Sequence, residues 1–172
     1  MQSLQGRILV SSPHLLDPNF FQTAVLLVHH TDDGALGLIL NRPTEVPVGD
    51  AWEKISETPC HRSGTLFHGG PCDGPMMVLH RHESVGEIEM LPGIHFSAEQ
   101  EHVAWLIEQD GDSSRFFVGN SGWAPGQLEQ ELETGAWIVI DGTSEHVFCD
   151  ADRWIEVLER IARMTTKDAS SN

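Results

Sequence analysis

Short runs of apolar residues, each bounded by glycine, proline or polar turn residues, divide the chain into compact segments. Residues 22–30 and 35–41 are apolar and rich in branched side chains, and the segment 31–34 between them, Thr-Asp-Asp-Gly, has the composition of a tight turn. This pattern predicts a β-hairpin. Because both arms are nearly continuous apolar runs rather than alternating ones, we expect the hairpin to be covered on both faces.

The same criteria predict the remaining elements. Further strands are expected at 6–11, 65–68, 76–82, 86–91, 115–118 and 136–140. Helices are expected after a cap at Asp50, from a capping box of Ser97 and Gln100 to near Gly111, over 125–134, and after a cap at Asp150. Clustered strands without a regular β-α alternation predict an α+β fold. No repeat or linker divides the chain, so we expect one domain over 1–164 and a flexible polar tail over 165–172.

The charge of the chain narrows the possible partners. Twenty-six acidic and ten basic side chains give a formal net charge of -16 over 172 residues, and no run of Lys or Arg forms a basic patch. Phosphate backbones are repelled by such a protein, so we expect no direct nucleic-acid partner. The 40% of apolar residues is normal for a globular protein and predicts ordinary folding without a disulfide or metal.

The cysteines and the N-terminus bear on the compartment. Cys60, Cys72 and Cys149 are odd in number and have no CxxC spacing, which suits a reducing compartment. No signal-like apolar region and no run of eighteen apolar residues is present. We therefore expect a cytoplasmic protein that is not inserted in a membrane.

The segment 119–129, with the sequence GNSGWAPGQLE, is the most distinctive of the chain. A glycine turn followed by a helix start exposes backbone amides that favour an anion. The alternative, which we favour, is that the glycines only permit a sharp turn while Trp123 fills the core. Ser121 between a strand and a helix resembles a nucleophile elbow, but that motif requires glycine where Trp123 stands.

Metal and arginine chemistry leave two further questions open. Ten histidines are present, but none of the spacings is that of a known zinc site, so we expect no bound metal and no other cofactor. Arg42 is one of few cations and follows the predicted hairpin. Its guanidinium could form an internal salt bridge that pins the loop, which we favour, or could bind an anionic ligand.

Taken together, these segments resemble the bacterial YqgE/AlgH family over about residues 4–164. The resemblance is carried by Ser12-Pro13, Asp17-Pro18-Asn19-Phe20, His30, the segments 34–43, 69–71 and 122–131, Leu79-His80, Ala136-Trp137 and Asp152-Arg153-Trp154. It implies an α+β fold in which a bent, mixed and mainly antiparallel sheet forms a pseudo-barrel with helices packed outside. Family members have been named as transcriptional regulators, and the resemblance implies no catalytic residues.

This sequence departs from the family pattern at three places. Cys72 stands where an aliphatic residue is usual, and Asn120 stands where an aromatic residue is common. The acidic residue that usually precedes the histidine of the family pattern is absent before His30, which argues against an essential Glu-His pair at that point. Because of Cys72 and Asn120, the surroundings of Trp123 are expected to be more polar than in relatives.

Two functional hypotheses follow. The first is a non-enzymatic regulatory or adaptor protein that affects transcription indirectly through a protein partner or a small anionic ligand. The alternative is a hydrolase or transferase that uses the glycine-turn surface near Gly70, Ser121 and Trp123. In either case we expect the functional surface where three turns converge, at Asn41, Arg42, Gly69, Gly70, Gly122, Trp123 and Gln127.

Overall fold

The computed structural model of the chain describes residues 2–15, 17–109, 111 and 113–170. Within these residues the strands are β1 (Ile8–Ser11), β2 (Ala24–Thr31), β3 (Gly34–Ile39), β4 (Pro43–Pro47), β5 (Thr65–His68), β6 (Met77–His80), β7 (Ile88–Leu91), β8 (Ile94–Ser97), β9 (Ser114–Val118), β10 (Ser121–Trp123) and β11 (Trp137–Ile140). The helices are α1 (Val48–Ser56), the 3-10 helix η1 (Glu83–Val85), α2 (Gln100–Ile107), α3 (Gln127–Glu133), α4 (Ser144–Phe148) and α5 (Ala151–Ser170).

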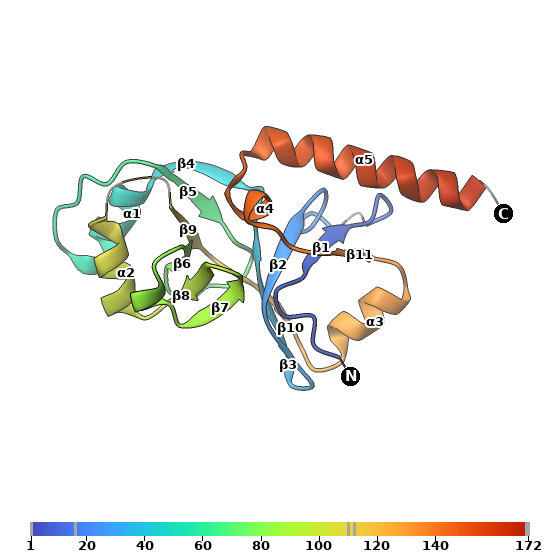
Figure 1. Ribbon diagram of the computed structural model, residues 1–172, viewed down its shortest axis with the longest axis horizontal. Helices are drawn as coiled ribbons and strands as arrows, with labels where there is room; N and C mark the ends of the chain where they lie inside the picture. Colours follow the sequence, from blue (N-terminus) through green and yellow to red (C-terminus); the bar gives the residue numbers. More distant parts are fainter. Residues whose placement is uncertain (1, 16, 110, 112, 171–172) are drawn as a thin grey trace.

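The described strands form two sheets (Figure 1). One has the strand order β10-β3-β2-β1-β11 and the other the order β4-β5-β9-β6-β8-β7. The strand pairs are antiparallel except for β5 and β9, which run parallel. The expected α+β class with mixed, mainly antiparallel pairing is confirmed. The sheets do not close into a barrel, so the pseudo-barrel implied by the resemblance describes them only loosely.

The predicted hairpin is β2 and β3, and its centre is buried on both faces. Successive side chains of a strand point to opposite faces of the sheet. Leu26 and Leu38 belong to a core cluster that also holds residues of the six-stranded sheet. Leu27 and Ile39 belong to a different cluster, which includes Leu128 of α3. Because each face has its own apolar cover, the hairpin shows continuous apolar runs instead of alternation.

Helices α1 and α2 cover the six-stranded sheet, and α5 lies alongside β1 and β11 of the five-stranded sheet (Figure 1). A third core cluster joins Val78 and Phe116 of this sheet to Trp52 of α1 and Leu106 of α2. Trp154 of α5 is fully buried in the cluster that the two sheets share. The layers therefore run from α3 through the five-stranded sheet and the six-stranded sheet to α1 and α2.

The predicted capping box before α2 is wrong. Ser97 lies in β8, a strand that the sequence analysis did not predict, and its hydroxyl donates to the carbonyl oxygen of Val85 at 2.6 Å. Helix α2 begins at Gln100, and the side chain of the preceding Glu99 makes no capping hydrogen bond. Ser97 thus belongs to a paired strand, while Gln100 begins the helix without a capping box.

The two predicted aspartate caps have different outcomes. Asp50 lies in the first turn of α1, which already begins at Val48, so its predicted capping role is wrong. The cap at Asp150 is confirmed, because its Oδ1 accepts a hydrogen bond from the backbone amide of Arg153 at 2.9 Å. Helix α5 continues to Ser170 and therefore includes most of the segment expected as a tail, whose last two residues lie outside the described part.

Among the described residues, no helix has both the length and the apolar character that crossing a membrane requires.

Candidate functional site

Two of the predicted glycine segments meet through their backbones. A Cβ added to Gly69 would lie 2.3 Å from the carbonyl oxygen of Gly119, and one added to Gly70 would lie 2.4 Å from Oγ of Ser121. Gly70 also has φ +153°, which disfavours other residues. The amide of Ile39 donates to the Gly69 carbonyl oxygen at 2.8 Å. Glycine is therefore required here so that chain segments can cross.

Ser121 and Trp123 are structural in this fold. They belong to β10, which pairs with β3, so the expected open turn ends at Asn120. Ser121 is fully buried, and its hydroxyl donates to the carbonyl oxygen of Gly69 at 3.1 Å. Trp123 is 5% exposed and packs against Phe20 and Trp137 at ring-centroid distances of 6.0 and 6.1 Å. Trp123 thus fills the core as the favoured interpretation expected.

Asn41 and Arg42 fasten the hairpin end to the preceding loop. Oδ1 of Asn41 accepts from the amide of Ala24 at 3.0 Å, while its Nδ2 donates to the carbonyl oxygen of Gln22 at 3.0 Å. The guanidinium of Arg42 donates to the carbonyl oxygens of three loop residues, Pro18, Asn19 and Phe21, at distances of 2.6 to 3.4 Å. Arg42 pins a loop, as the favoured alternative proposed, but it does so through carbonyl groups rather than a carboxylate.

Burial lowers the pKa of Arg42, and the nearby Asp17 carboxylate acts in the opposite direction. The backbone carbonyl oxygen of Arg42 accepts from the amide of His68, the neighbour of Gly69, at 2.8 Å. The backbones of the predicted surface therefore do converge. The side chain of Gln127 points elsewhere, since its Oε1 accepts from the amide of Ala124 at the start of the short α3.

A groove between α5 and the strand ends contains Asn41 and Arg42. This α5 groove has a volume of about 470 Å³ and is lined by Val10, Ser11, Ser12, Pro13, Phe21, Gln22, Asn41, Arg42, Ala151, Ile155, Leu158, Glu159, Ile161 and Ala162. Two large apolar side chains in its walls are strongly exposed, with Phe21 at 46% and Ile155 at 54%. Ligand pockets are typically of this size and apolar, with a few polar groups. Of the seven predicted site residues, the groove contains two.

The position of α5 is set by an arginine that the sequence analysis did not single out. Arg115 of β9 donates to the carbonyl oxygens at the end of α4, those of Val147, Phe148 and Cys149, at 2.7 to 3.0 Å. Terminal carbonyl groups of a helix lack intrahelical partners, so this contact fixes the turn from α4 into α5. The indole of Trp154 then donates to the carbonyl oxygen of His146 at 3.1 Å. One wall of the α5 groove is thereby tied to β9 and α4.

A larger hollow of about 840 Å³ lies at the starts of β5 and β9 and contains Arg62 and Arg115. Both cations already have backbone partners. Arg62 donates to the carbonyl oxygens of Leu106, Ile107 and Gln109 at the end of α2. An arginine that satisfies the end of a helix is bound in place, so we assign these two residues a structural role.

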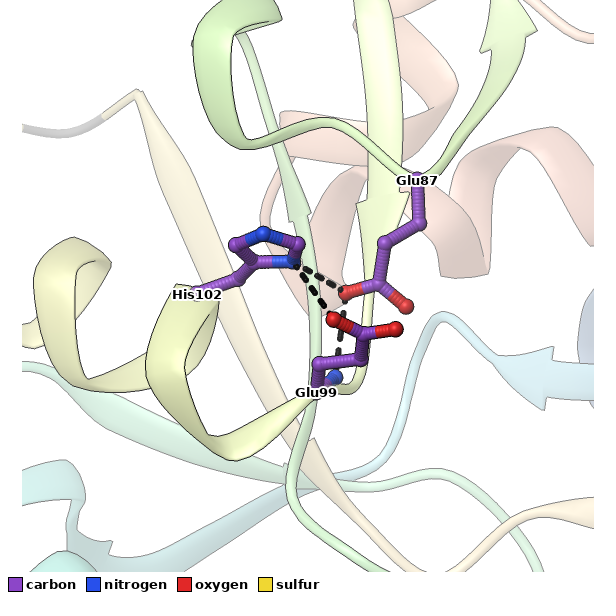
Figure 2. Close-up of side chains that lie close together, drawn as sticks. All are labelled: Glu87, Glu99 and His102. Carbon is purple, nitrogen blue, oxygen red and sulfur yellow. Dashed lines mark hydrogen bonds and ion pairs between the residues drawn. The ribbon is translucent and has the colours of Figure 1, made fainter.

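A cluster of Glu87, Glu99 and His102 lies where η1, β7 and α2 meet (Figure 2). Nδ1 of His102 is 3.0 Å from Oε2 of Glu87 and 3.6 Å from Oε2 of Glu99. Oε2 of Glu87 also accepts from the amides of Ala98 and Glu99 at 2.8 and 3.0 Å, so Glu87 caps α2 from outside the helix. The three ligand atoms lie within 4.8 Å of one another, close enough for a divalent cation. Capping and the ion pair account for this arrangement without one.

The electrostatics of the pair are consistent with capping. Burial pushes the pKa of Glu87 upward, but the hydrogen bonds from His102 and from the two amides outweigh it and leave the pKa below its ordinary value. The hydrogen bond to Glu87 raises the pKa of His102. The charged forms of Glu87 and His102 therefore stabilise each other. Sequence could not reveal this contact, because the two residues are in different elements.

A second acid-histidine contact also joins distant segments. Nε2 of the buried His30 lies 2.6 Å from Oε1 of Glu129 in α3, and its Nδ1 accepts from the amide of Leu4 at 2.9 Å. Since Nδ1 is an acceptor, Nε2 carries the proton and donates to Glu129. This hydrogen bond is the main cause that lowers the pKa of Glu129. The residue before His30 is not acidic, as the sequence shows, but a carboxylate from another part of the chain, that of Glu129, lies beside its ring.

Comparison with known proteins gives consistent matches. A family model described as AlgH-like matches residues 8–165. The UPF0301 protein CT0663 of Chlorobaculum tepidum is 38% identical and covers 84% of this chain and 79% of its own length, and the UPF0301 protein SCO2948 of Streptomyces coelicolor is 35% identical and covers 93% and 88%. The solution structure of the AlgH protein from Pseudomonas aeruginosa has a TM-score of 0.75 and 27% identity, and the match covers 94% of this chain and 92% of that one.

Proposed function

The chain belongs to the AlgH-like family, and we propose that it is a non-enzymatic regulatory or adaptor protein that holds a protein partner in the α5 groove. The observation that carries this proposal is the exposure of Phe21 and Ile155 at a mainly apolar groove between α5 and the strand ends. Exposed apolar side chains gathered at a hollow are typical of interaction sites. Any effect on transcription would pass through that partner.

The enzymatic alternative has less support from the geometry. Ser121, the nucleophile that this alternative needs, is fully buried and donates to a backbone carbonyl rather than to a base. A serine nucleophile requires an adjacent general base and access for the substrate. Gly70 and Trp123 beside it are held by backbone crossing and core packing. The glycine-turn surface therefore supports an architectural role better than a catalytic one.

A small anionic ligand is likewise less well supported than a protein. Arg42 is the cation of the α5 groove, and its guanidinium already donates to three loop carbonyl groups. An anion would have to compete with these contacts and release the loop. Most of the remaining wall is apolar, which suits side chains of a partner protein.

Site-specific photo-crosslinking tests the proposed function. A benzophenone amino acid is placed at Ile155 in the groove, or at Ile55 on α1 as a matched control, since the two isoleucines are 54% and 44% exposed. We expect a discrete adduct from position 155 in source cells and none from position 55. The crosslinked protein, once purified, should bind the unmodified chain in solution. Equal adducts at both positions, or no adduct at position 155, would contradict the proposal.

A further inference from the structure

We infer that the segment bound in the α5 groove is a basic amphipathic helix of the partner, which lays its apolar face against Phe21 and Ile155. This inference rests on the proposed function and specifies the partner of the same site. Three properties of the groove support it: its apolar walls, the hydrogen bonds that its backbone groups already make, and the charge around it.

The apolar walls suit a few side chains that project from one face of a helix. Besides the exposed Phe21 and Ile155, the half-buried Leu158 and Ile161 of α5 also line the groove. A volume of about 470 Å³ accommodates several side chains but not a folded domain. Helices that bind in grooves present such anchors at i, i+3 or i+4, and i+7. The shape of the site therefore favours a partner that contributes one row of apolar residues.

The backbone of the groove wall argues against a bound β-strand. Strand addition needs unpaired amide and carbonyl groups along an edge. Here the amide of Ser11 donates to the carbonyl oxygen of Thr23 at 3.0 Å, and that of Ser12 donates to Ala136 at 2.9 Å. The opposite wall is α5, whose backbone is paired within the helix. Recognition must therefore come from side chains, as in helix binding.

Charge indicates that the partner is basic. The chain carries a formal net charge of -16, which attracts cationic proteins and repels a second copy of itself and anionic membranes. Glu159 lines the groove and is exposed, and its carboxylate has no hydrogen-bond or ion-pair partner among the described residues. The cation in the wall, Arg42, is held by loop carbonyl groups. A helix with Lys or Arg beside its apolar row would meet the carboxylate of Glu159 at the rim.

A designed peptide tests this inference without knowledge of the natural partner. The probe is a fluorescent helix of leucine and lysine with leucines at helical spacing, and the controls are a scrambled peptide of the same composition and a leucine-glutamate version. Binding is followed by fluorescence anisotropy at about 0.15 M salt, where long-range attraction is screened. We expect the affinity of the wild-type protein for the probe to exceed its affinity for either control peptide by about tenfold or more.

Three variants localise the binding. Ile155→Asp should weaken binding of the probe by about tenfold or more, because it places a charge against the apolar row. Glu159→Lys should weaken it by about threefold and reduce its salt dependence. Ile55→Asp, the same change at an exposed isoleucine of α1, should leave it unchanged. Melting temperatures of all variants confirm that each is folded.

Several outcomes would overturn the inference. Equal binding of the scrambled peptide would show that only charge is recognised, and equal loss in Ile55→Asp would place the site elsewhere. Binding of neutral-lipid vesicles that is lost in Ile155→Asp would identify a membrane as the occupant. If crosslinking at position 155 finds a partner while the basic probe does not bind, the partner class is wrong but the adaptor function stands.

Discussion

Nε2 of His80 and Oγ of Ser97 lie 2.8 Å apart in the buried pairing of β6 with β8. Nδ1 of the same ring accepts from the amide of His82 at 3.1 Å, which requires the neutral imidazole with its proton on Nε2. Ser97 in turn donates to Val85 of η1. The neutral histidine therefore connects β6, β8 and η1, and its protonation would disrupt these contacts.

This arrangement predicts loss of stability in acid. Burial, together with the neighbouring His95 and His82, lowers the pKa of His80 to about 4, whereas the unfolded chain has its ordinary value near 6.5. The unfolded state therefore binds more protons between these values, so the stability contributed by a neutral His80 is present above pH 6.5 and is lost as the pH falls toward 4. We expect a loss of about 2 kcal/mol from this residue between pH 7.5 and pH 5.

Urea unfolding at a series of pH values measures this loss. The variant His80→Gln cannot titrate at this position and should show a smaller decrease in unfolding free energy between pH 7.5 and pH 5. A lower unfolding free energy of the variant at neutral pH does not affect the comparison, because the quantity compared is the change of unfolding free energy with pH. Identical slopes for the variant and the wild type would show that His80 does not titrate as described.

Truncation of Trp123 tests whether it belongs to the core. We expect Trp123→Ala to lower the free energy of unfolding by about 3 to 5 kcal/mol, because a large aromatic side chain that is 5% exposed leaves a cavity. Trp105→Ala is the matched control, since Trp105 is 37% exposed, and it should cost much less. Chemical denaturation of both variants makes the comparison. Similar costs would mean that Trp123 is not the core residue described here.

How well sequence predicts this protein depends on how local the signal is. The β2–β3 hairpin and the Asp150 cap were predicted correctly, because apolar runs, turn residues and caps act within a few neighbouring positions. The Ser97 box failed, because pairing of β8 with β6 outweighed the local capping preference.

The candidate site depends on contacts that no local pattern encodes. Arg42 was recognised as a loop pin, but the groove beside it is closed by α5, more than a hundred residues later in the chain. The pair of His30 with Glu129 and the placement of α5 by Arg115 likewise join distant segments. Glycines were identified as important at Gly69 and Gly70, yet only their surroundings show that they serve chain crossing.

A gel-shift titration tests whether the protein binds duplex DNA. We expect no specific shift of duplex DNA at about 0.15 M salt, because a protein with net charge -16 repels phosphates. A mutant is not needed as a control, since competitor DNA separates specific from non-specific shifts. A sequence-dependent complex at nanomolar protein that survives competitor would require a direct role in transcription.

Metal removal tests the role given to Glu87 and His102. We expect the melting temperature to be unchanged by chelator treatment, because capping and an ion pair explain this cluster. Glu87→Gln should instead lower stability in the presence and absence of chelator alike, since it weakens the cap of α2. Elemental analysis of the purified protein completes the test. One zinc per chain, with a lower melting temperature after chelation, would contradict the prediction.

The most direct test of the account is the affinity of the partner recovered by crosslinking at position 155. Calorimetric titration of that purified partner compares the wild type with Ile155→Asp and with the surface control Ile55→Asp. We predict that Ile155→Asp weakens binding by about thirtyfold or more, as expected for an apolar anchor near the centre of an interface, while Ile55→Asp binds within about twofold of the wild type. Unchanged affinity in a folded Ile155→Asp protein would contradict the assignment of the α5 groove as the binding site.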